Sequence, residues 1–282
     1  MSGKILYGSA LTLCAGLLSG KAFAFAIFAV PFSTPVTPGQ IIDLTVSNTA
    51  VPAAFGNGIP LTWKQSTVGV TLAFAPNPPG PLTNGTTTWN QNGFSAIAEW
   101  NAVGANFAFA GSAGTGNPCL TDGTLVAAFH PSVCLGVLPS LALGISRIVA
   151  VVDSPSSIRI ADADIAIITP GTASSSGAMI NDAFDGPITF PNFDFRRIML
   201  HELGHSLGLA HPDNVFGTNP FTLNTVMHSQ SVLQNLSADD KNGALTLYPA
   251  PSSGGGGAGN AFVLGVFMAL VILGRHLWRR IV

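Results

Sequence analysis

One eleven-residue segment constrains the fold more than any other part of the 282-residue chain, and it reads HELGHSLGLAH from His201 to His211. His201 and His205 are four residues apart, so on a helix both imidazoles project from the same face. Gly208 lets the chain leave that helix sharply, which brings His211 back toward the other two side chains. The segment therefore predicts a helix that ends at Gly208 and three imidazoles directed at one point.

These three histidines have the composition of a catalytic metal site. Three neutral imidazoles leave the fourth position of a tetrahedral Zn²⁺ open for water, which distinguishes catalytic from structural zinc sites. We therefore expect one zinc ion on His201, His205 and His211. Glu202, next to the first ligand, is expected to accept a proton from the zinc-bound water, whose pKa the ion lowers to about 7.

Other interpretations of the segment are weaker. Histidine and glutamate are scarce in this chain, with six and two copies, so chance would produce the pattern in about 2 × 10⁻⁶ of chains with this composition. Ligand sets that use a downstream Glu are excluded, because no Glu follows Glu202. Asp213 stays open as an alternative third ligand, although His211 has the better spacing.

The chain resembles the metzincin zinc metallopeptidases, and within that clan the matrixins, over roughly residues 60–249. The zinc-binding motif is followed by Thr225-Val226-Met227, which matches the Met-turn of the clan. Three more segments are similar to the first helix, the strand beside the cleft and the C-terminal helix of a matrixin: 98–103, 163–165 and 236–248. The resemblance implies a zinc endopeptidase that acts on a protein or peptide substrate.

The resemblance also implies roles for single residues. Met227 would form an apolar floor beneath the zinc without binding it, and Asp164 matches a family calcium ligand, with a solvated acidic loop as the alternative. The Cys-containing propeptide switch of animal matrixins is absent, since no Cys lies between residues 25 and 118. The alternative function is a catalytically inactive, metzincin-like surface binding module, against which the retained Glu202 argues.

Hydrophobic periodicity and capping signals predict strands followed by helices. Alternating or apolar runs indicate strands at 41–46, 68–74, 107–110, 147–152 and 163–168. Helices are expected at 94–103, from the N-cap Asp194 to Gly208, and from the capping box at Ser237 through Leu247. This order indicates an α+β fold, and the resemblance specifies a metzincin-like catalytic domain with a twisted mixed sheet, an active-site helix and a C-terminal helix.

The N-terminal end is typical of export. Residues 1–24 read as a signal peptide, with Lys4, an apolar run at 5–18 and a small-residue cleavage pattern that ends at Ala24. Residues 25–59 form a segment without an assigned role, and the zinc peptidase domain is expected at 60–250.

The C-terminal end indicates a membrane signal. A Gly/Ser-rich linker at 251–260 precedes a short transmembrane or sorting tail at 261–282, which ends in an arginine cluster. This layout is similar to the glycine-led sorting tails of bacterial envelope proteins, and it implies a membrane partner and a tail-processing protease. A glycolipid-anchor signal is the rival, but such signals usually end in apolar residues. We expect an exported bacterial protein at the cell envelope or surface, membrane-anchored or released after tail processing.

Charge and cysteine usage support export. Only 9% of the residues are charged, which excludes coiled coils and basic nucleic-acid-binding arms. Five of the 11 basic residues lie in the two ends, so the part between them is acidic, which disfavours nucleic acid and is compatible with bound cations. Cys119 and Cys134 are the only cysteines outside the signal segment, and they are expected to form a disulfide in an oxidising compartment, with two buried thiols as the alternative.

Overall fold

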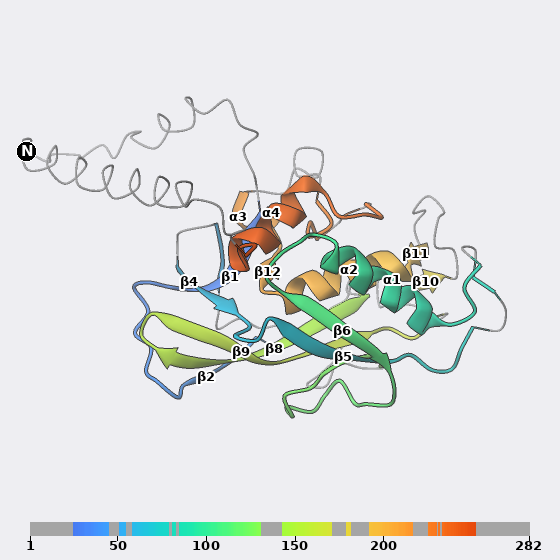
Figure 1. The fold of residues 1–282 in the computed structure, drawn as a ribbon, viewed down its shortest axis with the longest axis horizontal. Helices are drawn as coiled ribbons and strands as arrows, with labels where there is room; N and C mark the ends of the chain where they lie inside the picture. The colour runs from blue at the N-terminus through green and yellow to red at the C-terminus, as the bar shows by residue number, and fades with distance from the viewer. Residues whose placement is uncertain are drawn as a thin grey trace, which may run out of the picture.

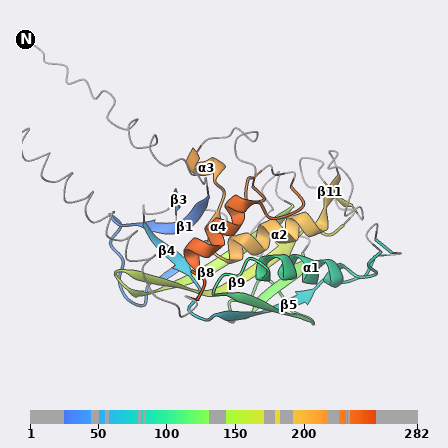
Figure 2. The same cartoon turned by 45° about the horizontal axis from the view of Figure 1, so that its top comes forward.

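The computed structural model describes most of the chain between the two ends: residues 25–44, 51–54, 58–78, 81–82, 85–130, 143–170, 179–181, 192–216, 225–229, 231 and 233–251. Most of the described strands form one large mixed sheet, and the helices α1, α2 and α4 cover one of its faces (Figures 1 and 2). Helix α2 packs on β8 and β9, and α1 packs on α2 and β6. The α+β class expected from the sequence is confirmed.

The large sheet contains ten of the described strands: β1 (Ala26–Pro31), β2 (Ile41–Asp43), β3 (Val51–Ala54), β4 (Gly58–Thr62), β5 (Thr67–Ala73), β6 (Ala108–Ala113), β7 (Leu125–Phe129), β8 (Gly144–Ser154), β9 (Ser157–Ile167) and β12 (Leu209–Ala210). Its main path runs β12-β1-β4-β9-β7-β5-β6. Along this path, every pair of neighbouring strands from β4 to β6 is parallel. By contrast, β8 is antiparallel to β9, and β1 is antiparallel to β4 and β12. A separate parallel pair consists of β10 (Met179–Asn181) and β11 (Asn192–Asp194).

The helices begin where the sequence offers side-chain caps. Helix α2 (Phe195–Ser206) starts after the N-cap Asp194, and α4 (Ala238–Leu247) starts after the Ser237 capping box, both as expected. Helix α1 (Trp89–Asn101) begins five residues before the expected position 94, because Thr88 and Gln91 form a capping box that the hydrophobic spacing does not reveal. Helix α3 (Asp213–Phe216) is a single turn.

Five expected strands are present with shifted ends, namely β2, β5, β6, β8 and β9. The sequence does not predict the strands β1, β3, β4, β7, β10, β11 and β12, because their short runs lack a clear alternation of apolar and polar residues. Strands β1, β2 and β3 come from the segment 25–59, and all three belong to the sheet on which α2 packs.

An aromatic cluster positions α2 on the sheet. Phe195, the first residue of α2, is fully buried, and its ring centroid lies 4.9 Å from that of Phe74 and 5.2 Å from that of Trp89. Farther along the helix, the indole of Trp100 donates to the carbonyl of Leu200 at 2.9 Å. These contacts hold α2 between α1 and the sheet.

Several predictions from the sequence lie outside the described residues, namely the signal peptide, the sorting tail and Cys134. Cys119 is disulfide-bonded, and its pairing with Cys134 stays a prediction. Among the described residues, no helix is long and apolar enough to cross a membrane.

Candidate metal centre

Helix α2 carries the first two candidate ligands. The Nδ1 atoms of His201 and His205 lie 2.8 Å from the carbonyl oxygens of Val226 and Leu209. A carbonyl can only accept, so each Nδ1 carries the proton and each Nε2 is left with a lone pair for a metal. The fold therefore fixes the tautomer that a zinc ligand requires.

The end of α2 brings the third histidine into place. Gly208 has φ +103°, a conformation that L side chains rarely adopt, and a Cβ there would collide with the carbonyl oxygen of Leu61. The last carbonyls of the helix are satisfied from elsewhere, because the Trp63 indole donates to Ser206 and the Tyr248 hydroxyl donates to Leu207, each at 2.8 Å. The chain then reverses into β12 and reaches His211.

The three Nε2 atoms form a compact triangle. The His201–His211 distance is 2.9 Å, the His205–His201 distance is 3.0 Å and the His205–His211 distance is 3.1 Å. A single Zn²⁺ ion, whose bonds to imidazole nitrogen are about 2.0–2.1 Å long, can reach all three atoms of such a triangle. Within the described part of the chain, this is the one group of histidine, cysteine or acidic side chains close enough to hold a metal ion.

The protonation state of the cluster also suits a metal. Burial lowers the pKa of His205 to about 3, and burial together with the neighbouring histidines holds the pKa of His201 well below its usual value. Burial lowers the pKa of His211 as well. All three imidazoles are therefore neutral at neutral pH, and three neutral ring nitrogens about 3 Å apart fit a bound cation.

The alternative third ligand, Asp213, is engaged elsewhere. Its carboxylate accepts hydrogen bonds from the backbone N–H of Ser229 at 3.1 Å and from the Ser229 hydroxyl at 2.5 Å. These bonds lower the pKa of Asp213 even though burial opposes the shift. The geometry therefore favours His211 as the third ligand.

Glu202 lies buried on α2 against strand β8, with 5% of its surface exposed. The Ser146 hydroxyl lies 2.7 Å from the Glu202 carbonyl oxygen and 3.0 Å from its Oε2. A Cβ at Gly144 would come within 3.0 Å of the Glu202 side chain. Burial raises the pKa of Glu202 to about 8, and a divalent cation nearby would favour the ionised carboxylate instead.

The Met-turn lies against α2 and contacts the first candidate ligand through the carbonyl oxygen of Val226. Met227 is buried, and its sulfur is the nearest atom to the place that a Cβ on Gly204 of α2 would take. The turn is held by Asp240 of α4, whose carboxylate accepts from the Thr225 hydroxyl and from the backbone N–H groups of Val226 at 2.9 Å and Met227 at 3.1 Å. Since Val226 also accepts from His201, Asp240 supports a ligand through the backbone of the turn.

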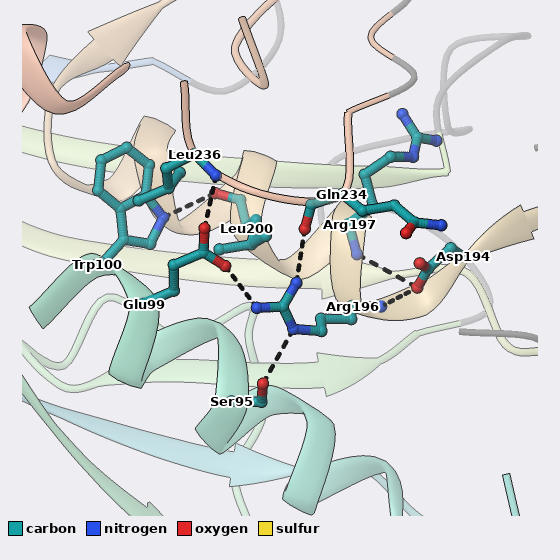
Figure 3. A network of polar contacts seen from close by, with 9 residues as sticks. All are labelled: Ser95, Glu99, Trp100, Asp194, Arg196, Arg197, Leu200, Gln234 and Leu236. Atoms are coloured by element: carbon teal, nitrogen blue, oxygen red, sulfur yellow. Dashed lines mark hydrogen bonds and ion pairs between the residues drawn. The ribbon is translucent and has the colours of Figure 1, made fainter. Parts of the chain in front are cut away.

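A second polar network ties α1 and α2 to the segment after the Met-turn (Figure 3). Arg196 forms an ion pair with Glu99 and donates to the carbonyl oxygen of Gln234, while Glu99 accepts from the backbone N–H of Leu236 at 2.6 Å. Arg197, beside it on α2, donates to the carbonyl oxygen of Ser231. The sequence does not predict this network, because its contacts join residues that are far apart along the chain.

Asp164, the expected calcium ligand, lies on β9 and is not part of the histidine cluster. It is 2% exposed; its Oδ1 accepts from the backbone N–H of Val126 at 2.9 Å, and its Oδ2 has no hydrogen-bond partner among the described residues. Burial raises the pKa of Asp164 to about 7. The same strand holds Asp162, also buried, with an unpaired Oδ1 in the described structure. Calcium binding at Asp164 stays a prediction.

The mixed sheet, the histidine helix, the Met-turn and the C-terminal helix together define a metallopeptidase catalytic domain of the metzincin kind. Residues 71–249 match the family model of the matrixin peptidases, and the chain belongs to this family. No curated protein matches the chain. Matrixins are zinc-dependent peptidases, which agrees with the three neutral imidazoles of the cluster.

Proposed function

We propose that the protein is an exported zinc-dependent endopeptidase that hydrolyses internal peptide bonds of a protein or peptide substrate. The observation that carries the proposal is the convergence of three neutral imidazoles in a matrixin fold, with a buried carboxyl group, Glu202, on the residue that follows the first ligand. A module that only binds other proteins has no need for a buried carboxyl group at this position, because its desolvation costs stability.

In the candidate metal centre, the histidines would bind the metal ion and Glu202 would transfer protons. His201, His205 and His211 would hold the zinc ion, which supplies Lewis acidity toward a carbonyl oxygen and a lower pKa for water. Glu202 would take the proton from the attacking water and deliver it to the nitrogen of the leaving amine. The Ser146 hydroxyl, which donates to Glu202, would hold the carboxylate in one orientation between these two transfers.

The test compares Glu202→Gln with the unsubstituted protein, purified with zinc present. We expect about one zinc per chain in both, with peptide or casein cleavage reduced by a factor on the order of 10²–10⁴ in the variant. Glu99→Gln is the matched control, because Glu99 is the only other glutamate in the chain and forms an ion pair with Arg196. Zinc binding without any cleavage by the unsubstituted protein would instead favour the binding module.

We propose further that residues 1–24 direct export and that the tail at 261–282 tethers or sorts the protein at a bacterial cell envelope until a tail-processing protease removes it. The support is the pattern of apolar runs, the small-residue cleavage site and the C-terminal arginine cluster. Mass spectrometry of the protein from membrane and released fractions tests both ends. A mature chain that begins at Phe25 is expected, and a chain that retains Met1 would contradict the export proposal.

A further inference from the structure

The N-terminal strand β1 lies against the part of the chain that connects two of the candidate metal ligands. Ala26 pairs with Ala210 and Ile27 pairs with Leu209, in antiparallel register. Among the described residues, β12 has no other strand partner. The two-residue strand between His205 and His211 is therefore held in the sheet by β1.

Strand β12 contacts one of these histidines and leads directly into the other. The carbonyl oxygen of Leu209 accepts the Nδ1 proton of His205, with a distance of 2.8 Å, and Ala210 immediately precedes His211. Displacement of β12 would move the carbonyl that orients one ligand and the backbone that carries the next. The pairing of β1 with β12 therefore acts on the candidate ligands indirectly, through the residues of β12.

Phe28 adds two direct contacts. Its backbone N–H donates to the carbonyl oxygen of Gly208 at 2.8 Å, at the point where the chain leaves α2. Its ring centroid lies 5.6 Å from that of His205, with an interplanar angle of 41°. One residue therefore fixes the turn after α2 and packs against a ligand, so the ring of His205 has little freedom to rotate away from its neighbours.

We propose that strand β1, and Phe28 within it, is a positioning element of the metal centre that sets how tightly the three histidines retain a divalent metal ion. The inference rests on the proposed zinc site. Strand β1 lies outside residues 71–249, the part that matches the matrixin family model, so the family match assigns it no role. The segment 25–59, whose role the sequence left open, thereby gains a function in its first strand.

The experiment measures metal retention, which a role in stability alone would not change selectively. Full-length protein carrying Glu202→Gln, to prevent self-cleavage, is loaded with zinc and mixed with an excess of a chromogenic chelator, and the rate of zinc loss is recorded. Phe28→Leu removes the ring but keeps the N–H group, and Phe28→Tyr keeps both. Phe94→Leu is the matched control, since Phe94 is a half-buried ring on α1 with no ring contact to the histidines.

We expect Phe28→Leu to lose zinc roughly tenfold faster than the parent protein, the lower end of the effects seen for groups that support metal ligands. Phe28→Tyr should behave as the parent does, and Phe94→Leu should retain zinc normally even where its melting temperature falls. Replacement of zinc by Co²⁺ adds a spectroscopic measure, because the visible spectrum of cobalt depends on the arrangement of its ligands. The cobalt spectrum should change in Phe28→Leu and stay the same in Phe28→Tyr and Phe94→Leu.

Equal rates of zinc loss in Phe28→Leu and Phe94→Leu would overturn the inference and leave the proposed peptidase intact, provided that the parent binds zinc. A parent protein that binds no zinc would overturn both. If Phe28→Leu is not recovered in folded form, Phe28→Met, which retains a longer side chain, gives the same comparison with the same two outcomes.

Discussion

The buried carboxyl group of Asp164 makes the stability of the fold depend on pH in an unusual direction. Its pKa is about 7 in the folded protein against 3.8 for an ordinary aspartate, chiefly because burial disfavours the charged form. Acidic neighbours, Asp162 and Asp122, raise the pKa further, whereas the N–H of Val126 and the charge of Arg147 lower it. The folded protein therefore binds a proton here that the unfolded chain has already released.

The sign and size of the effect follow from proton linkage. Because the folded pKa is the higher one, the stabilisation from this proton is fully present below about pH 4 and is lost as the pH rises through about 7. One pKa unit corresponds to about 1.4 kcal/mol, so the loss amounts to at most about 4 kcal/mol. Asp164→Asn keeps the shape of the side chain and cannot ionise, so it should remove this dependence.

The assay is urea unfolding followed by tryptophan fluorescence between pH 4 and 8, in zinc-containing buffer without calcium. The measured quantity is the difference in unfolding free energy between the parent and Asp164→Asn, from which the titration of other groups cancels. As the pH rises from 4 to 8, we expect the unfolding free energy of Asp164→Asn to increase relative to that of the parent by up to about 4 kcal/mol. Asp153→Asn, on the same β8–β9 hairpin, controls for the loss of one negative charge.

A difference that stays constant within about 0.5 kcal/mol from pH 4 to 8 would refute the reasoning, because it would mean that the carboxyl group ionises normally in the folded state. Added calcium then tests the metal prediction at the same residue. If Asp164 binds Ca²⁺, millimolar calcium at pH 8 should stabilise the parent and leave Asp164→Asn unchanged.

Two further predictions concern the surroundings of the metal centre. Asp240→Asn should lower the unfolding free energy by about 2 kcal/mol, because the carboxylate that holds the Met-turn becomes an amide with one acceptor oxygen for several buried donors. Urea unfolding measures this loss, and an unchanged midpoint would contradict the prediction. Gly144→Ala should reduce kcat roughly tenfold at unchanged zinc content, since the added methyl group would displace the Glu202 side chain. An unchanged kcat in peptide-cleavage assays would show that catalysis tolerates this displacement.

The parts of the site that could be predicted from the sequence depend on neighbours along the chain. The His201 and His205 spacing, the turn at Gly208 and the caps at Asp194 and Ser237 are local signals, and the structure has all of them. In each case the residues that interact lie within a few positions of one another, where helix geometry fixes their relative placement.

The rest of the site depends on contacts between distant segments. Ser146 reaches Glu202 from a strand 56 positions earlier, and Phe28 reaches His205 from the N-terminal strand. Neither residue type is unusual enough to attract notice, and the pairing of strands that places them cannot be read from periodicity. The sequence predicts the capping box at Ser237, to which Asp240 belongs, but the hydrogen bonds from the Met-turn to Asp240 are seen only in the structure.

The pairing of Ala26 with Ala210 also has a consequence for the order of folding. Contacts between residues so far apart close a long loop, and they cannot form until both strands have been synthesised. Of the strands that the structure describes, β1, which supports His205, is synthesised first, and its partner β12 is synthesised near the end of the domain. Peptidase activity should therefore arise all at once in a nearly complete domain, so that a nascent or truncated chain has no working site with which to digest itself or its neighbours.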